Sequence, residues 1–110
     1  MSSESPQEIM ARVAPEFSAL TKDFLWGSIW ERPGLATRDK YLITITTMVA
    51  LARIEQLDIY LELGLKNGLS KDEIVAAITH IAFYAGWPTA VSALVHLDTM
   101  IEQISSEQHF

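Results

Sequence analysis

An uncharged run extends from Ile74 to Leu97, without a single Asp, Glu, Lys or Arg. Such a run is typical of a membrane span, a buried helical hairpin or the wall of a site. Gly86 and Pro88 divide it into two pieces of about 12 residues, each roughly 18 Å long as a helix. The hydrocarbon core of a bilayer is about 30 Å thick, so neither piece spans it. We therefore expect a buried helical hairpin, whose many small residues suit close helix packing.

Composition limits the classes of protein to which the chain can belong. Its 110 residues suit one domain, residues 1–110, with a polar tail at about 105–110 that is expected to fray. Hydrophobic residues make up 49% and charged residues 20%, so we expect self-association to cover apolar surface. The net charge of -6 argues against nucleic acid and anionic membranes as partners. A protein or a small molecule is the expected partner.

Two absences restrict the chemistry and the expected location. The chain has no cysteine, which excludes disulfides, thiolate catalysis and cysteine-based metal sites. The first ten residues lack the basic flank and apolar stretch of a secretory signal, so a cytoplasmic location is expected.

Capping signals predict where two helices begin. Ser5-Pro6-Gln7-Glu8 combines a capping box with proline at the first helical position, and predicts a short helix to about Val13. Leu69-Ser70-Lys71-Asp72-Glu73-Ile74 combines a second capping box with the positions of a hydrophobic staple. It predicts a helix over about residues 70–84, followed by the Gly86 to Pro88 break and a last helix over about residues 88–104.

Two further helices are expected between these signals. After Pro15 a segment should carry Phe17, Leu20, Phe24 and Leu25 inward and should end or bend at Gly27. Thr37 is the predicted cap of the longest, central helix, from about Arg38 to Lys66, closed by Asn67-Gly68. The sequence thus predicts an all-α domain of about five helices, with a long central helix and an antiparallel helical hairpin.

Several kinds of site are absent from the sequence. His80, His96 and His109 are not spaced as a pair of helical metal ligands, so no metal site is predicted. Nucleophile motifs and glycine-rich phosphate loops are also missing, and no organic cofactor is expected. His96 shares a polar stripe with Ser92 and Thr99, which indicates a surface or interface position.

The candidate chemistry lies on two predicted helices. Arg53, Gln56 and Tyr60 share one face of the central helix, and His80 lies on the helix that follows it. If these helices pack antiparallel, His80 comes within reach of Arg53 or Gln56. A histidine there could act as general acid or base, Tyr60 as a proton donor, and Arg53 could hold a carboxylate. The alternatives are a hydrogen-bonded core or interface histidine, and an ion pair of Arg53 with Glu55, Glu62 or a neighbouring subunit.

Aromatic side chains are candidates for the wall of a substrate pocket. Trp26, Trp30, Tyr84 and Trp87 are the predicted wall, with Gln56 as a further substrate contact. The alternative for the paired tryptophans is a packed aromatic plug.

The segments Trp26 to Leu35, Arg38 to Arg53, Asn67 to Ile74 and Tyr84 to Pro88 together resemble the gamma-carboxymuconolactone decarboxylase family. The resemblance covers about residues 24–100. It implies an all-helical fold, an intertwined homo-oligomer, as a hexamer or trimer, and a pocket between helices near subunit contacts. It also implies a lyase of aromatic degradation.

The related alkylhydroperoxidase-like branch uses a Cys-x-x-Cys pair, and that peroxidase activity is excluded because this chain has no cysteine. In the decarboxylase branch, the resemblance implies a glutamate near Gln56 and a histidine where Tyr60 stands. Arg53, Tyr84, Gly86 and Pro88 match the family pattern.

Two functions follow from these observations. The first is a cofactor-independent carboxy-lyase that acts on a small carboxylated or lactone substrate. The second is a non-catalytic oligomeric protein that binds a small molecule and retains the fold, because Gln56 and Tyr60 replace an ionisable acid/base pair.

Overall fold

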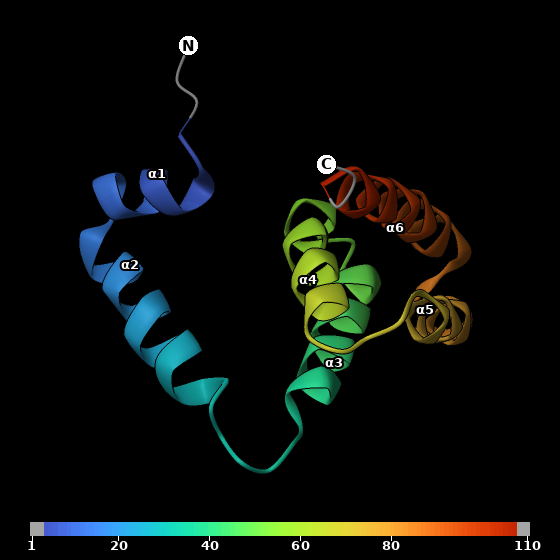
Figure 1. Cartoon of the computed structure of the whole chain (residues 1–110), viewed down its shortest axis with the longest axis horizontal. Helices are drawn as coiled ribbons and strands as arrows, with labels where there is room; N and C mark the ends of the chain where they lie inside the picture. The colour runs from blue at the N-terminus through green and yellow to red at the C-terminus, as the bar shows by residue number, and fades with distance from the viewer. Residues whose placement is uncertain (1–3, 108–110) are drawn as a thin grey trace. The chain divides into compact units, whose positions relative to one another are not determined.

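The computed structural model describes residues 4–107, and every regular element within them is helical, which confirms the predicted all-α class. The chain divides into two compact units, one ending at Leu35 and the other beginning at Ala36. Figure 1 traces the helices of each unit along the chain.

The first unit contains α1 (Pro6–Val13), α2 (Pro15–Leu20) and the π-helical segment η1 (Thr21–Ile29). α1 begins at the predicted capping box, in which the Glu8 amide donates to Ser5 Oγ at 3.1 Å. α2 and η1 form one continuous helix that runs past Gly27 to Ile29, so of the predicted end or bend at this glycine, the end is wrong. A single glycine costs a helix only about 1 kcal/mol, which does not stop it.

No described residue of α1, α2 or η1 is buried. Phe17, Leu20 and Phe24, which the sequence analysis placed inward, are instead 60%, 55% and 57% exposed. These three residues lie on helices as predicted, but they are not buried, because the described part of this unit has no hydrophobic core.

The second unit contains α3 (Thr37–Ala50), α4 (Ile54–Lys66), α5 (Lys71–Ala85) and α6 (Trp87–Glu107). The predicted central helix over residues 38–66 is therefore wrong, because the chain breaks at Leu51 to Arg53. Ala52 adopts a left-handed conformation with φ of 57°. The break lets α4 fold back onto α3, with which it packs side by side (Figure 1). Thr37 is the first helical residue of α3 rather than its cap, which is Ala36.

The core of this unit is formed by one stripe from each helix. α3 contributes Ile45 and Val49, α4 contributes Leu57 and Leu61, and α5 contributes Ile74 and Ile78, all fully buried. α6 closes the core with Ala93 and Leu97, among others. Packing α4 onto α3 buries two apolar stripes that a single long helix would leave in water, which explains why the break is favoured.

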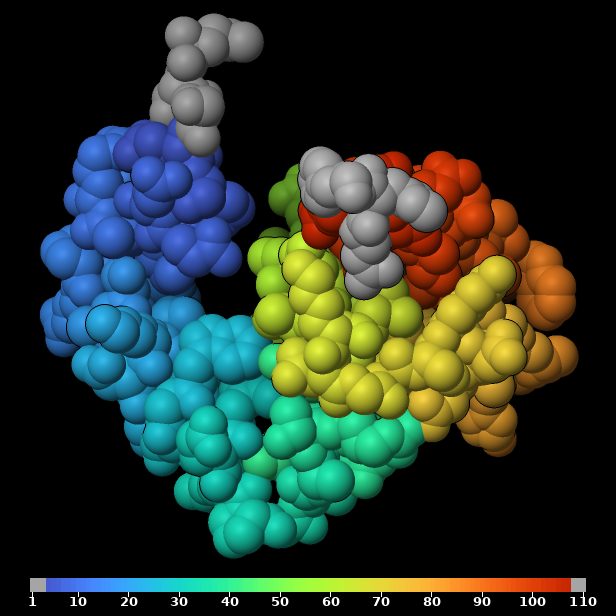
Figure 2. All heavy atoms as spheres, in the orientation of Figure 1, coloured from blue at the N-terminus to red at the C-terminus, as the bar shows by residue number. Residues whose placement is uncertain are grey.

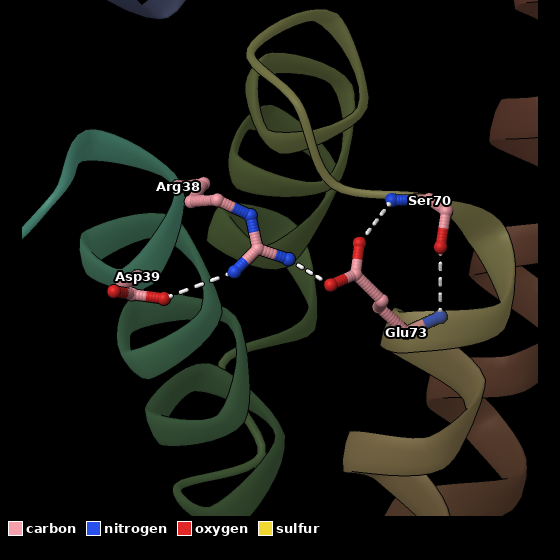
Figure 3. A network of polar contacts seen from close by, with 4 residues as sticks. All are labelled: Arg38, Asp39, Ser70 and Glu73. Carbon is pink, nitrogen blue, oxygen red and sulfur yellow. Dashed lines mark hydrogen bonds and ion pairs between the residues drawn. The ribbon is translucent and has the colours of Figure 1, made fainter.

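α3 and α5 run in the same direction. Arg38, at the start of α3, forms an ion pair with Glu73, at the start of α5 (Figure 3). Further along, Thr46 of α3 and His80 of α5 line one groove. α5 was expected to pack antiparallel on the second half of the central helix. It packs instead on α3 and α6.

The uncharged run forms the predicted helical hairpin of α5 and α6. Gly86 joins the two helices with φ of 114°, a left-handed value that favours glycine. The capping box at Ser70 and Glu73 is present, and Leu69 and Ile74 are both buried. No helix among residues 4–107 is long and apolar enough to cross a membrane. α6 includes 105–107, which were assigned to the tail, and residues 108–110 lie outside the described residues.

Candidate functional site

One face of α4 carries Arg53, Gln56 and Tyr60. Arg53 is the N-cap of this helix, and its carbonyl accepts a hydrogen bond from the Leu57 amide at 2.9 Å. The spacing of three and then four residues places the three side chains on one side of α4. Arg53 and Gln56 are exposed, and Tyr60 is half-buried. The sequence analysis predicted this shared face, and the helix that forms it begins one residue after Arg53.

The Arg53 guanidinium makes no ion pair or hydrogen bond with another side chain among residues 4–107. The alternative of an ion pair with Glu55 or Glu62 is therefore not seen, since Glu62 pairs with Lys66. The unpaired amide groups at the start of a helix carry partial positive charge, which adds to that of the arginine. This end of α4 is therefore suited to an anion such as a carboxylate.

Tyr60 lies close to Tyr41 of α3, and the sequence analysis missed Tyr41 as a neighbour of the site. Burial raises the pKa of the Tyr60 phenol above its ordinary value. Burial also raises the pKa of Tyr41, and the neighbouring Tyr60 adds to that shift. Both phenols thus stay protonated at neutral pH and can donate a hydrogen bond or a proton. The only sequence signal for this pair was the apolar, all-round character of the first part of α3.

His80 is separate from the face of α4. It lines an open groove between α3 and α5, together with Leu42, Ile43, Thr46 and several residues of α5. Its ring lies 5.3 Å from the ring of Tyr84. Arg53, Gln56 and Tyr60 do not line this groove. The expected approach of His80 to Arg53 or Gln56 assumed that α5 packs against the helix of Arg53, whereas α5 packs mainly on α3 and α6.

The other ionisable side chain of this groove, Glu73, is fully engaged. One of its oxygens accepts from the Ser70 amide at 3.0 Å, and the other pairs with Arg38, which also contacts Asp39 at 3.1 Å (Figure 3). The cluster of one arginine and two carboxylates holds the starts of α3 and α5 together. Its net charge is negative, so it is poorly suited to bind a carboxylate.

The predicted aromatic wall is divided between the two units. Trp26 and Trp30 stack in the first unit, with ring centroids 4.9 Å apart. Tyr84 and Trp87 lie on the second unit and are 78% and 65% exposed. Trp87 lines a small apolar groove between α5 and α6.

A polar contact missed from the sequence joins α4 to α6. His96 Nδ1 lies 2.8 Å from Asp58 Oδ1, and both side chains line a small pocket with Thr99 and Gln103. The expected surface or interface position of His96 is compatible with its partial exposure. Within residues 4–107, no group of three or more His, Cys, Asp or Glu residues could hold a metal ion.

The sequence is similar to one protein family and to two characterised proteins. The model of the carboxymuconolactone decarboxylase family matches residues 15–98. A 4-carboxymuconolactone decarboxylase from Acinetobacter baylyi is 37% identical over 79 residues, which cover 72% of this chain and 59% of that protein. The nitrosuccinic acid decarboxylase npaB from Metarhizium robertsii is 29% identical over 76 residues, which cover 69% of this chain and 53% of that protein. The chain therefore matches only a little over half the length of these relatives.

Proposed function

The chain belongs to the carboxymuconolactone decarboxylase family, and from this we propose that it removes carbon dioxide from a small organic acid at the Arg53 face of α4. The observation that carries the proposal is the exposed Arg53 guanidinium, without a side-chain partner in the described chain, on the same face as Gln56 and Tyr60. The names of the two relatives support a decarboxylase.

The proposed substrate is an acid whose carboxylate stands β to a carbonyl or lactone carbonyl group. When its C–CO2 bond breaks, the electron pair moves toward the carbonyl oxygen and an enolate forms. The substrate itself supplies this electron sink, so the proposal needs no metal or organic cofactor. The enzyme's part is to bind the carboxylate, stabilise the enolate oxygen and return a proton to carbon.

Each of these tasks has a candidate on α4. Arg53 binds the carboxylate through its planar fork of donors, and the Gln56 amide donates to the carbonyl oxygen. Tyr60, held in its protonated form by burial, donates the proton that forms the new C–H bond and regains one from water. Arg53 and Tyr60 are about 10 Å apart along the helix. Their two long side chains, with a small acid bound between them, fill this distance.

The test is turnover of 4-carboxymuconolactone and of a series of small β-keto acids, followed by carbon dioxide release and substrate loss. Arg53→Gln should raise KM, and Tyr60→Phe should lower kcat by about 10²–10⁴-fold, as expected for loss of a general acid. Ser92→Ala removes a hydroxyl from an exposed position of α6 and should leave both constants unchanged.

His80→Asn tests the remaining predicted catalytic residue in the same assay. A loss of kcat in His80→Asn but not in Tyr60→Phe would move the proton donor to the groove between α3 and α5, and would refute the role of Tyr60. An acid that raises the melting temperature yet is recovered unchanged would instead support the alternative, a binding protein without turnover. Gln56 and Tyr60 are neutral where the family resemblance implies an ionisable pair, and this favours that alternative.

A further inference from the structure

A second polar pocket lies between α4 and α6, away from the Arg53 face of α4. Asp58 lines it, and this residue is two positions from both Gln56 and Tyr60, so it lies on the other side of the helix. α4 and α6 pack side by side (Figure 1), and both reach the molecular surface in Figure 2. The pocket has a volume of about 160 Å³. A cavity of this size holds a molecule as large as benzene.

Asp58 fixes the orientation of the His96 ring in this pocket. His96 Nδ1 lies 2.8 Å from Asp58 Oδ1. Because a carboxylate only accepts hydrogen bonds, Nδ1 carries the proton, and Nε2 of the neutral ring is left as an acceptor. The two side chains are 35% and 43% exposed, so a ligand can reach them from solvent.

Two neutral side chains of α6 complete the polar lining of the pocket. The Thr99 hydroxyl donates to the Val95 carbonyl at 3.2 Å, so its oxygen is left to accept. The Gln103 carboxamide, which also lines the pocket, adds another oxygen acceptor. The second oxygen of Asp58 is a further acceptor. The groups of this pocket that remain for a ligand are therefore mostly acceptors, and the ligand has to donate hydrogen bonds.

The charge around the pocket is negative. α6 carries Asp98, Glu102 and Glu107 and no Lys or Arg. The one cation within α4, Lys66, is paired with Glu62. Charge of one sign along a pocket attracts ligands of the opposite sign and repels those of the same sign. The pocket is therefore suited to a cation and unsuited to a carboxylate.

From these observations we infer that the pocket between α4 and α6 binds a small primary ammonium ion with a short carbon chain. The ammonium group donates to Asp58, to His96 Nε2 and to Gln103, and the carbon chain contacts Val95 and Met100. A divalent metal ion is disfavoured, because no group of three or more His, Asp or Glu residues comes together among residues 4–107. The inference does not depend on the proposed decarboxylation.

The first test uses the natural chain and the ring nitrogens of its histidines, observed by ¹⁵N NMR at pH 8, above the range in which histidine ordinarily titrates. The His96 signals are those missing from the spectrum of His96→Gln. They should show a proton on Nδ1, and n-butylammonium chloride should shift Nε2 in a saturable way. With five non-hydrogen atoms, n-butylammonium should bind in the millimolar range.

Three matched compounds test the ligand class in the same spectra. n-Butanol has the same chain without the charge, butyrate has the opposite charge, and sodium chloride supplies a cation without the chain. Each should shift His96 much less than n-butylammonium does. No saturable shift with n-butylammonium up to about 100 mM would overturn the inference. An equal shift with n-butanol or sodium chloride would also overturn it.

A matched pair of variants tests the role of Asp58. Asp58→Asn keeps the size of the side chain and removes its charge, and it should weaken n-butylammonium binding about tenfold or more, as measured from the backbone amide shifts of α6. Asp98→Asn removes the same charge from an exposed position of α6 that does not line the pocket, and should change the affinity less than about twofold. Circular dichroism checks that both variants stay helical. Equal affinities in the two variants would overturn the inference.

Discussion

The connection between α3 and α4 permits a prediction whose sign is unusual for glycine. Ala52 is held at φ of 57°, where a Cβ atom costs an L-residue about 1–2 kcal/mol. Ala52→Gly removes this cost and adds about 0.5–1 kcal/mol of backbone entropy loss on folding. The methyl group is exposed, so its removal leaves no cavity. The net expectation is a gain of about 0.5–1 kcal/mol in the free energy of unfolding.

The measurement is urea unfolding followed by circular dichroism at a fixed protein concentration, because association would shift the midpoint. A gain of this size raises the melting temperature by about 2–8 °C in a domain of 60–100 residues. The matched control is Ala76→Gly, which removes another exposed methyl group from the interior of a right-handed helix, α5. It should lose about 1 kcal/mol. Equal losses in both variants would refute the argument from the left-handed conformation.

Two further predictions concern ionisation and capping. Because the pKa values of Tyr41 and Tyr60 are raised in the folded chain, the unfolded chain loses these protons first. The free energy of unfolding should therefore fall as pH rises above about 10. In urea titrations between pH 7 and 11, Tyr60→Phe should make this fall shallower. An unchanged slope of the free energy of unfolding against pH would contradict the prediction. Ser70→Ala should lower the free energy of unfolding by about 1 kcal/mol through loss of the cap. Glu73→Gln keeps an acceptor for the cap, and it should lower the free energy of unfolding by less than Ser70→Ala does, because the ion pair with Arg38 is exposed. A larger loss in Glu73→Gln would show that the ion pair matters more than the cap.

Helix starts with local signals could be predicted from the sequence. The capping boxes at Ser5 and Ser70 depend only on residues within one turn, and both occur as predicted. The break at Gly86 could also be predicted, since Pro88 follows two residues later, and Gly86 does adopt positive φ. These features need no knowledge of the rest of the chain.

The break at Ala52 could not be predicted in this way. The segment from Leu51 to Arg53 contains neither glycine nor proline, and alanine has the highest helix propensity. The break depends on the gain from packing Leu57 and Leu61 of α4 against α3, which only the folded unit reveals. Tertiary packing outweighs local preference here.

The same distinction applies to the candidate site. The shared face of Arg53, Gln56 and Tyr60 is an inference from spacing along one helix, of which Gln56 and Tyr60 are members and Arg53 is the N-cap. The position of His80 depends on whether α5 packs against α3 or against α4. α5 is apolar on more than one side, so its sequence fits α3 as well as α4, and the packing on α3 places His80 in a groove that Arg53 does not line.

The parallel arrangement of α3 and α5 also has a consequence for the order in which this unit folds. α3 and α4 are separated by Leu51 to Arg53 alone, and α5 and α6 by Gly86, so each antiparallel pair can form by closing a very short loop. Arg38 and Glu73 meet across 35 positions of sequence, a contact that requires a much longer loop to close. We therefore expect the two hairpins to form first and to dock in the slow step, with the ion pair between Arg38 and Glu73 appearing only as docking is completed.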